Sequence, residues 1–125
     1  MNKFIKSLIS LIKFLNIKKE KRKIVFYTEN ESFYTFFSGI IDKLTNKYSL
    51  DIYYITSSKT DPLLHNGNSK IKSFYVGSET IKTIFFQLFN SQIMILTMPD
   101  LNTFHIKKSK YNVNYIFIPH NILSI

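Results

Sequence analysis

The sequence has no cysteine and no tryptophan, and only three glycines and three prolines in 125 residues. Without cysteine, the chain has no disulfide framework, no zinc ribbon and no thiolate nucleophile, and it fits a reducing, cytosolic compartment. Three glycines cannot conceal a glycine-rich phosphate loop, and neither the dinucleotide-binding fingerprint nor the Walker P-loop occurs. A nucleotide would therefore have to bind without either of these loops.

Acidic residues are also few, since eight aspartates and glutamates stand against 17 lysines and arginines. The imbalance is local: residues 1–23 hold eight of the basic residues and a single acidic one, Glu20. The rest of the chain is nearly neutral and rich in phenylalanine and tyrosine, as one globular domain with a core requires. Attraction to a polyanionic partner is therefore a property of the N-terminal segment.

Residues 4–17 carry apolar side chains at helical spacing, with lysines and Ser7 on the opposite side. We predict a basic amphipathic helix over residues 1–23 that lies in the headgroup region of an anionic membrane leaflet. The basic residues expected to bind that surface are Lys3, Lys6, Lys13, Lys18, Lys19, Lys21, Arg22 and Lys23.

Other interpretations of this segment fit less well or stay open. It is shorter than a transmembrane span, which needs about 20 apolar residues, and it lacks the cleavage site of a signal peptide. Nucleic acid is not an expected partner, because aromatic residues are not interleaved with the basic run. The alternative that stays open is an ordinary amphipathic helix packed on the body or on a partner chain.

In the remaining residues, short apolar segments typical of strands alternate with segments that have the hydrophobic spacing of helices. Short apolar segments predict strands at 24–27, 51–56, 71–76, 92–97 and 113–118. Apolar residues at steps of three and four predict helices at 33–48 and 78–89. Ahead of the first of these helices, Thr28 and Glu31 have the spacing of a capping box, with Asn30 as an alternative N-cap.

Strands that alternate with helices and are apolar on both faces are typical of a parallel sheet covered on both sides. We therefore predict an α/β fold for residues 24–125, a Rossmann-like open parallel sheet of about five strands with flanking helices. Ligands of such sheets bind beyond the carboxyl ends of the strands. The positions to inspect are residues 28–31, 56–58, 97–100 and 119–120.

His120 follows the last predicted strand, where an imidazole with a pKa near neutrality can take a proton from an alcohol. A structural histidine, hydrogen-bonded at the strand end, is the alternative. The other candidates are open to similar alternatives, as turn caps or solvated loop residues; they are Glu29, Asp100, Lys107 and Lys108. The three histidines lack metal-ligand spacing, so neither a metal nor a cofactor is expected.

Four segments together resemble the N-terminal half of the CDP-glycerol glycerophosphotransferase family, which includes the teichoic-acid primases and polymerases. The resemblance covers roughly residues 23–125, and in chain order the segments are Ile52–Ser57, Phe74–Gly77, Thr97–Leu101 with His105–Ser109, and Tyr115–His120. It implies a two-domain enzyme of the glycosyltransferase B type, peripheral to the cytoplasmic face of the membrane. Such an enzyme transfers glycerol phosphate from CDP-glycerol to a lipid-linked acceptor.

By this resemblance the N-terminal domain faces the acceptor and His120 is the base, although Asn121 stands where the family usually has Gly or Ser. CDP-glycerol would be bound by a second domain that these residues do not include, so we expect a truncated chain that is inactive alone. Two alternatives are a non-catalytic, membrane-associated α/β module or remnant that needs a partner chain, and a related glycosyltransferase of surface-polysaccharide synthesis.

Overall fold

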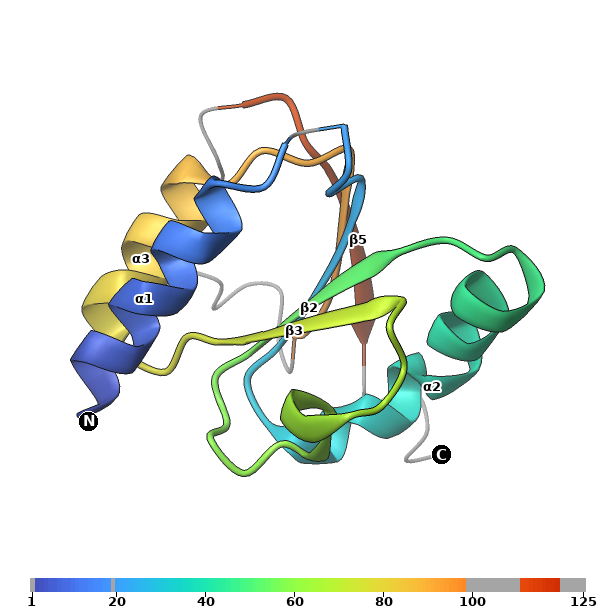
Figure 1. Ribbon diagram of the computed structural model, residues 1–125, viewed down its shortest axis with the longest axis horizontal. Helices are drawn as coiled ribbons and strands as arrows, with labels where there is room; N and C mark the ends of the chain where they lie inside the picture. The colour runs from blue at the N-terminus through green and yellow to red at the C-terminus, as the bar shows by residue number, and fades with distance from the viewer. Residues whose placement is uncertain (1, 19, 99–110, 120–125) are drawn as a thin grey trace.

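The computed structural model describes residues 2–18, 20–98 and 111–119. Five parallel strands form one sheet in the order β3-β2-β1-β4-β5 (Figure 1). The strands are β1 (Ile24–Thr28), β2 (Ile52–Thr56), β3 (Ile71–Tyr75), β4 (Ile93–Met98) and β5 (Asn114–Pro119). The α-helices are α1 (Lys3–Leu15), α2 (Tyr34–Asp42) and α3 (Glu79–Leu88). The predicted Rossmann-like α/β sheet with flanking helices is confirmed.

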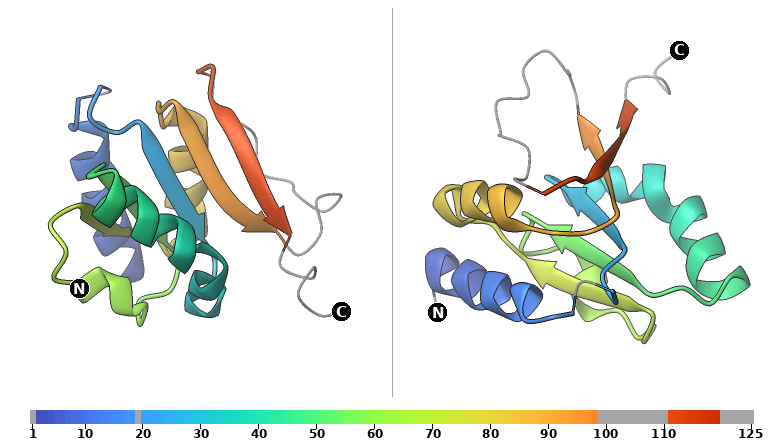
Figure 2. Two further views of the ribbon diagram at one scale, coloured as in Figure 1. Left: turned by 90° about the vertical axis from the view of Figure 1, so that its right-hand side faces the viewer. Right: turned by 90° about the horizontal axis from the view of Figure 1, so that it is seen from above.

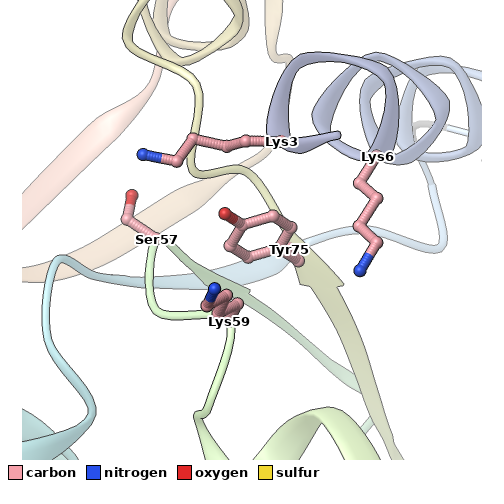
Figure 3. Close-up of a pocket in the computed structure, with 5 residues that line it drawn as sticks. All are labelled: Lys3, Lys6, Ser57, Lys59 and Tyr75. Carbon is pink, nitrogen blue, oxygen red and sulfur yellow. The ribbon is translucent and has the colours of Figure 1, made fainter. Parts of the chain in front are cut away.

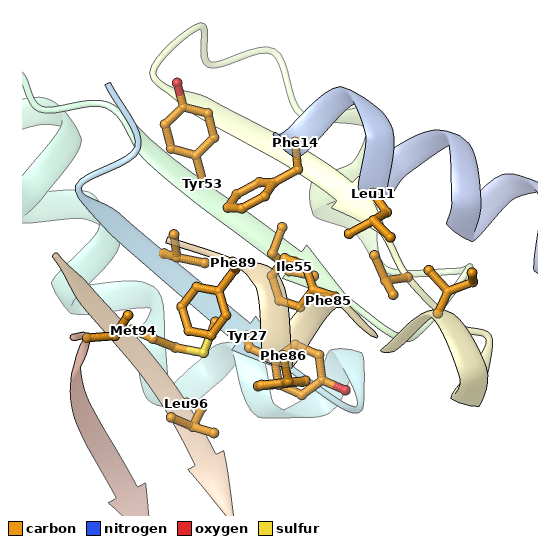
Figure 4. Close-up of a cluster of buried hydrophobic side chains, with 14 residues drawn as sticks. Leu11, Phe14, Tyr27, Tyr53, Ile55, Phe85, Phe86, Phe89, Met94 and Leu96 are labelled. Carbon is orange, nitrogen blue, oxygen red and sulfur yellow. The ribbon is translucent and has the colours of Figure 1, made fainter. Parts of the chain in front are cut away.

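Helices cover both faces of the sheet, because the strands are apolar on both sides. Side chains of β1 alternate between two cores: Val25 and Tyr27 pack beneath α1 and α3, and Phe26 packs beneath α2. The views from two directions show α1 and α3 side by side on one face and α2 on the other (Figure 2). The larger core is rich in aromatic rings, several of which meet edge to face (Figure 4).

The segment predicted as one helix over residues 33–48 is built from three helical geometries. A 3₁₀ turn, η1 (Glu31–Phe33), precedes α2, and a π-helical turn, η2 (Lys43–Lys47), follows it. The buried hydroxyl of Thr45 donates to the carbonyl of Ile41 at 2.8 Å, a side-chain contact that competes with the regular helical pattern. The helix ends at Ser49, whose φ of 55° is left-handed, as helix C-termini often are.

Helix α1 packs on the body of the protein through Ser7, Leu11 and Phe14. The prediction that Ser7 lies on the solvent side with the lysines is wrong, because Ser7 is fully buried. Its Oγ accepts hydrogen bonds from the backbone N–H groups of Gly77 and Ser78, at 2.9 and 3.0 Å. These are N–H groups at the start of α3, where a helix has no partners of its own for them.

The other end of α1 is held by Arg22, which is buried although it belongs to the predicted membrane-binding set. Its Nη1 donates to the carbonyl of Phe14 at 2.7 Å, and the guanidinium lies 5.0 Å from the centre of the Phe14 ring. A carbonyl at a helix C-terminus and an aromatic face are both favourable surroundings for a cation. Arg22 therefore joins α1 to the segment that leads into β1.

Replacing Ser7 by alanine should destabilise the fold without changing its apolar packing. The variant Ser7→Ala leaves the N–H groups of Gly77 and Ser78 without their acceptor, which should lower the free energy of unfolding by about 1–3 kcal/mol. Urea unfolding followed by circular dichroism measures the change. Ser10→Ala, on the same helix at a partly exposed position, is the control and should change the value by less than about 0.5 kcal/mol. Equal effects of the two changes would contradict the docking role of Ser7.

Candidate functional site

The order of the strands places the topological switch point of the sheet at the carboxyl ends of β1 and β4. From β1 the chain proceeds to β2 on one side, while β4 and β5 lie on the other side. Ligands of open α/β sheets bind where the strand order reverses in this way. The residues that follow β1, β2 and β3 meet at this edge, since Thr28 pairs with Thr56 and Thr56 pairs with Tyr75.

Glu29 follows β1 at this edge and is ion-paired with a buried lysine. Lys82, on α3, is only 5% exposed. Its ammonium group lies 3.1 Å from Glu29 Oε1 and 2.9 Å from Glu79 Oε1. Burial acts to lower the pKa of Lys82, but the hydrogen bonds and charges of Glu79 and Glu29 outweigh it and raise that pKa. Glu29 is thus a carboxylate held in place, and its partly exposed side chain can accept a hydrogen bond from a hydroxyl group.

A second set of contacts runs from β1 through Ser57 to the end of β3. The Tyr27 and Ser57 hydroxyl oxygens lie 2.7 Å apart, and Ser57 Oγ donates to the carbonyl of Val76 at 2.9 Å. Because Ser57 has a single hydroxyl proton, Tyr27 must be the donor in the first contact. Burial, reinforced by the charge of Glu29, raises the pKa of Tyr27 well above its ordinary value. Tyr27 is therefore a neutral donor.

Glu31 does not form the capping box that its spacing predicts. Asn30 is the N-cap, and its side chain accepts from the N–H of Ser32 at 2.9 Å. The Oε1 of Glu31 instead accepts from the hydroxyl groups of Ser58, at 3.3 Å, and Thr60, at 2.5 Å. The interaction joins the loop after β1 to the loop after β2.

Several predicted site residues lie outside the described residues, namely His120, Asp100, Lys107, Lys108 and Lys19. Among the described candidates, the structure brings Glu29 to the carboxyl edge and, unexpectedly, Lys3 and Lys6 close to it. Lys13, Lys18, Lys21 and Lys23 are exposed further along α1 and the connection to β1. Within the ranges that the structure describes, no helix is long and apolar enough to cross a membrane.

Sequence reasoning missed Lys82 and Tyr75. The strand-end rule directs attention to Ser57 and Ser58, but it does not single out a lysine on a helix. The signal for Lys82 is its position directly after the buried Ile81 and three residues after Glu79, where a helix brings the two charged side chains together. Its second carboxylate partner, Glu29, comes from another element and only the fold reveals it.

The stability of the protein should fall in alkaline solution, starting near pH 10. Lys82 and Tyr27 have folded-state pKa values above their ordinary values of 10.5 and 10.0. The folded state therefore binds protons more tightly, so stability is fully present below pH 10 and is lost as the pH rises through the folded pKa values. Urea unfolding between pH 7 and 11 measures this, and the double variant Lys82→Met, Tyr27→Phe should show a shallower fall. A wild-type curve that is flat to pH 11 would contradict both shifts.

Comparisons with protein-family models, with curated proteins and with solved structures found no match to this chain. The α/β architecture therefore rests on the chain's own structure. The function has to be inferred from the chemistry of the carboxyl edge and from the surface of α1.

Proposed function

We propose that this chain is the acceptor-side portion of a CDP-glycerol glycerophosphotransferase-like enzyme, which transfers glycerol phosphate to a membrane-linked acceptor in surface-polymer synthesis. The observation that carries the proposal is the placement of α1. Its first turns lie beside the loops that follow β2 and β3, so a helix suited to a membrane surface borders the edge of the sheet where ligands bind. An acceptor held by its lipid would be presented to this edge.

The outward side of α1 has the chemistry of a membrane contact. Three isoleucines stay exposed after α1 has packed on the sheet, with Ile5 at 43%, Ile9 at 38% and Ile12 at 51%. Lys6 and Lys13 are exposed on the same helix, and Lys18, Lys21 and Lys23 follow it. Apolar side chains bordered by lysines match the boundary between acyl chains and anionic headgroups. We therefore propose that this face of α1 binds an anionic membrane surface. The protein would then be peripheral to the cytoplasmic side of the membrane.

In the proposed reaction, an acceptor hydroxyl loses its proton to a base and its oxygen forms a bond to the phosphorus of glycerol phosphate. The phosphoanhydride bond to CMP breaks, and CMP leaves with the electron pair. By the family resemblance the base is His120, and the nucleotide belongs to a second domain. Glu29, whose side chain is 41% exposed, is a group of the first domain that can orient an acceptor hydroxyl at the strand ends.

One observation favours a different class of protein, a non-catalytic membrane-associated module that needs a partner chain. The polar groups at the described edge bond mainly with one another: Lys82 with Glu29, and Tyr27 with Ser57. A mutually satisfied network of this kind also serves to hold loops in place. Assays of transfer and of acceptor binding separate the two functions, and nucleotide-sugar donors test for a related glycosyltransferase.

Removing the exposed isoleucines should weaken membrane binding. The triple variant Ile5→Ser, Ile9→Ser, Ile12→Ser should lower partitioning onto anionic phosphatidylglycerol vesicles by at least about tenfold, because less apolar surface is buried in the interface. Vesicle flotation measures the partition coefficient. For a matched control, Ile9→Ser is compared with Ile40→Ser, since Ile40 is 39% exposed on α2 at the opposite face of the sheet.

A second set of variants tests how much the basic residues contribute to membrane binding. Replacing Lys18, Lys21 and Lys23 by glutamine should weaken binding by about 1 kcal/mol per residue at low salt. Arg22 is left in place, because it is buried and bonds to Phe14. Equal partitioning of Ile9→Ser and Ile40→Ser, or equal binding to neutral and anionic vesicles, would exclude α1 as the membrane contact.

Because the proposal assigns the acceptor to this domain and CDP-glycerol to a second domain, this chain should bind the acceptor but catalyse no transfer. The chain should bind vesicles that carry a lipid-linked glycerol phosphate oligomer more tightly than vesicles of equal charge without it, while calorimetry detects no CDP-glycerol binding. It should release no CMP when both substrates are supplied. Release of CMP by this chain would show that the donor site lies within these residues, and equal binding to both kinds of vesicle would remove the acceptor from the proposal.

A further inference from the structure

A cavity of about 300 Å³ opens between α1 and the loops that follow β2 and β3. Three segments that are far apart in the sequence supply its lining, which consists of Lys3, Lys6, Ser57, Lys59 and Tyr75. Figure 3 shows the three lysines grouped around the Tyr75 ring, whose hydroxyl points toward the side of Lys3 and Ser57. The volume is at the lower end of the range for small-molecule sites, about 300–1,000 Å³.

The charged side chains that line this cavity are all lysines. Among the described residues, none of the three ammonium groups forms an ion pair with a carboxylate, since the ion pairs found there belong to Lys70 and Lys82. Three cations around one cavity repel one another and raise the local concentration of anions. An anion bound between them would remove that repulsion.

The two glutamates that follow β1 at this edge bond to other side chains. Glu29 is ion-paired with Lys82, and Glu31 accepts hydrogen bonds from Ser58 and Thr60 on either side of Lys59 in the sequence. Neither glutamate lines the cavity. Glu31 thus holds the loop that carries Lys59, and the lysine itself is exposed.

Tyr75 adds a neutral donor. Its ring lies over Gly77, where a Cβ on the glycine would overlap the ring and the hydroxyl group. Burial raises the pKa of Tyr75, so the hydroxyl keeps its proton at neutral pH and can donate it to an anion. The Ser57 hydroxyl donates to the carbonyl of Val76 and accepts from Tyr27, so its second lone pair can accept from a hydroxyl group on a ligand.

We propose that this cavity binds a phosphoryl group with a small polar substituent, as in glycerol phosphate. Three lysines act as point charges around a dianion, and the tyrosine hydroxyl and serine oxygen bind polar groups beside it. The inference that an anion binds here depends only on the cavity and the charge of its lysines. Its assignment to the terminal glycerol phosphate of an acceptor deepens the proposed function and rests on it.

Two pairs of substitutions, equal in charge, test the site in the full chain. Lys59→Gln and Lys3→Gln remove cations from the cavity, whereas Lys43→Gln and Lys47→Gln remove exposed cations elsewhere. Calorimetry with glycerol phosphate and with inorganic phosphate should show affinities about five- to tenfold weaker for the first pair and changed less than about twofold for the second. Tyr75→Phe, which removes only the hydroxyl, should weaken binding by a smaller factor.

Binding to vesicles distinguishes a lipid headgroup from a soluble phosphate ester as the ligand of this site. Flotation compares phosphatidic acid with phosphatidylserine at equal surface charge. Binding of free glycerol phosphate that depends on Lys59 supports the site and assigns it a soluble or chain-terminal ester. Absence of that binding, together with a Lys59-dependent preference for phosphatidic acid, supports the site and assigns it a headgroup.

Equal effects of all four lysine substitutions, or no dependence on Lys59 with either kind of ligand, would overturn the site. That result would leave the proposed function in place if Ile9→Ser still weakens membrane binding and the lipid-linked acceptor is still preferred. Conversely, Lys59-dependent phosphate binding without any membrane binding would keep the site and reject the membrane-linked acceptor.

Discussion

The hydroxyl oxygen of Ser7, which accepts the N–H groups of Gly77 and Ser78, determines where α1 lies on the protein. A sliding or rotated helix would leave two backbone donors at the start of α3 without an acceptor, which costs more than most single contacts contribute. The apolar contacts of Leu11 and Phe14 tolerate small displacements, but the directed hydrogen bonds do not. The hydrogen bonds of Ser7 therefore fix a single position for a helix whose other contacts are mainly apolar.

The surface proposed to be functional follows from that position of α1. With Ser7 held at the start of α3, Lys3 and Lys6 reach the carboxyl edge of the sheet, while Ile5, Ile9 and Ile12 keep their exposure. The same helix thus contributes cations to a cavity and an apolar stripe to the solvent side. A membrane contact and a phosphate site on adjacent sides of one helix would bring a lipid-linked anion to the end of the strands.

Basic side chains in this protein have different roles according to burial. Lys82 is buried and needs two carboxylates; Arg22 is buried and bonds to a helix-end carbonyl and a ring. Lys3, Lys6 and Lys59 are exposed at a cavity and form no ion pair with a carboxylate of the described residues, so their charge can attract an anion. The run of basic residues at the N-terminus is one feature in the sequence, but the fold divides it between structural and surface roles.

The strands and helices could be predicted because their apolar residues repeat with periods that reflect which side is buried. Prediction failed where a polar group is satisfied by a distant partner. Ser7 reads as a solvent-facing residue until the N–H groups of α3 are placed beside it. Glu31 has the spacing of a capping box, yet its partners are Ser58 and Thr60 in another loop. His120, Asp100, Lys107 and Lys108 stay predictions outside the described residues.

The sequence by itself determined the α/β class, the elements and the basic amphipathic character of the first helix, since periodicity and charge are local properties. Only the tertiary structure decided the strand order, the docking of α1 against α3 and β3, and the gathering of Lys3, Lys59 and Tyr75 around one cavity. The physical reason is that the local hydrophobic pattern specifies which face of a helix or strand is buried. Long-range packing and hydrogen bonding select the surface against which that face packs.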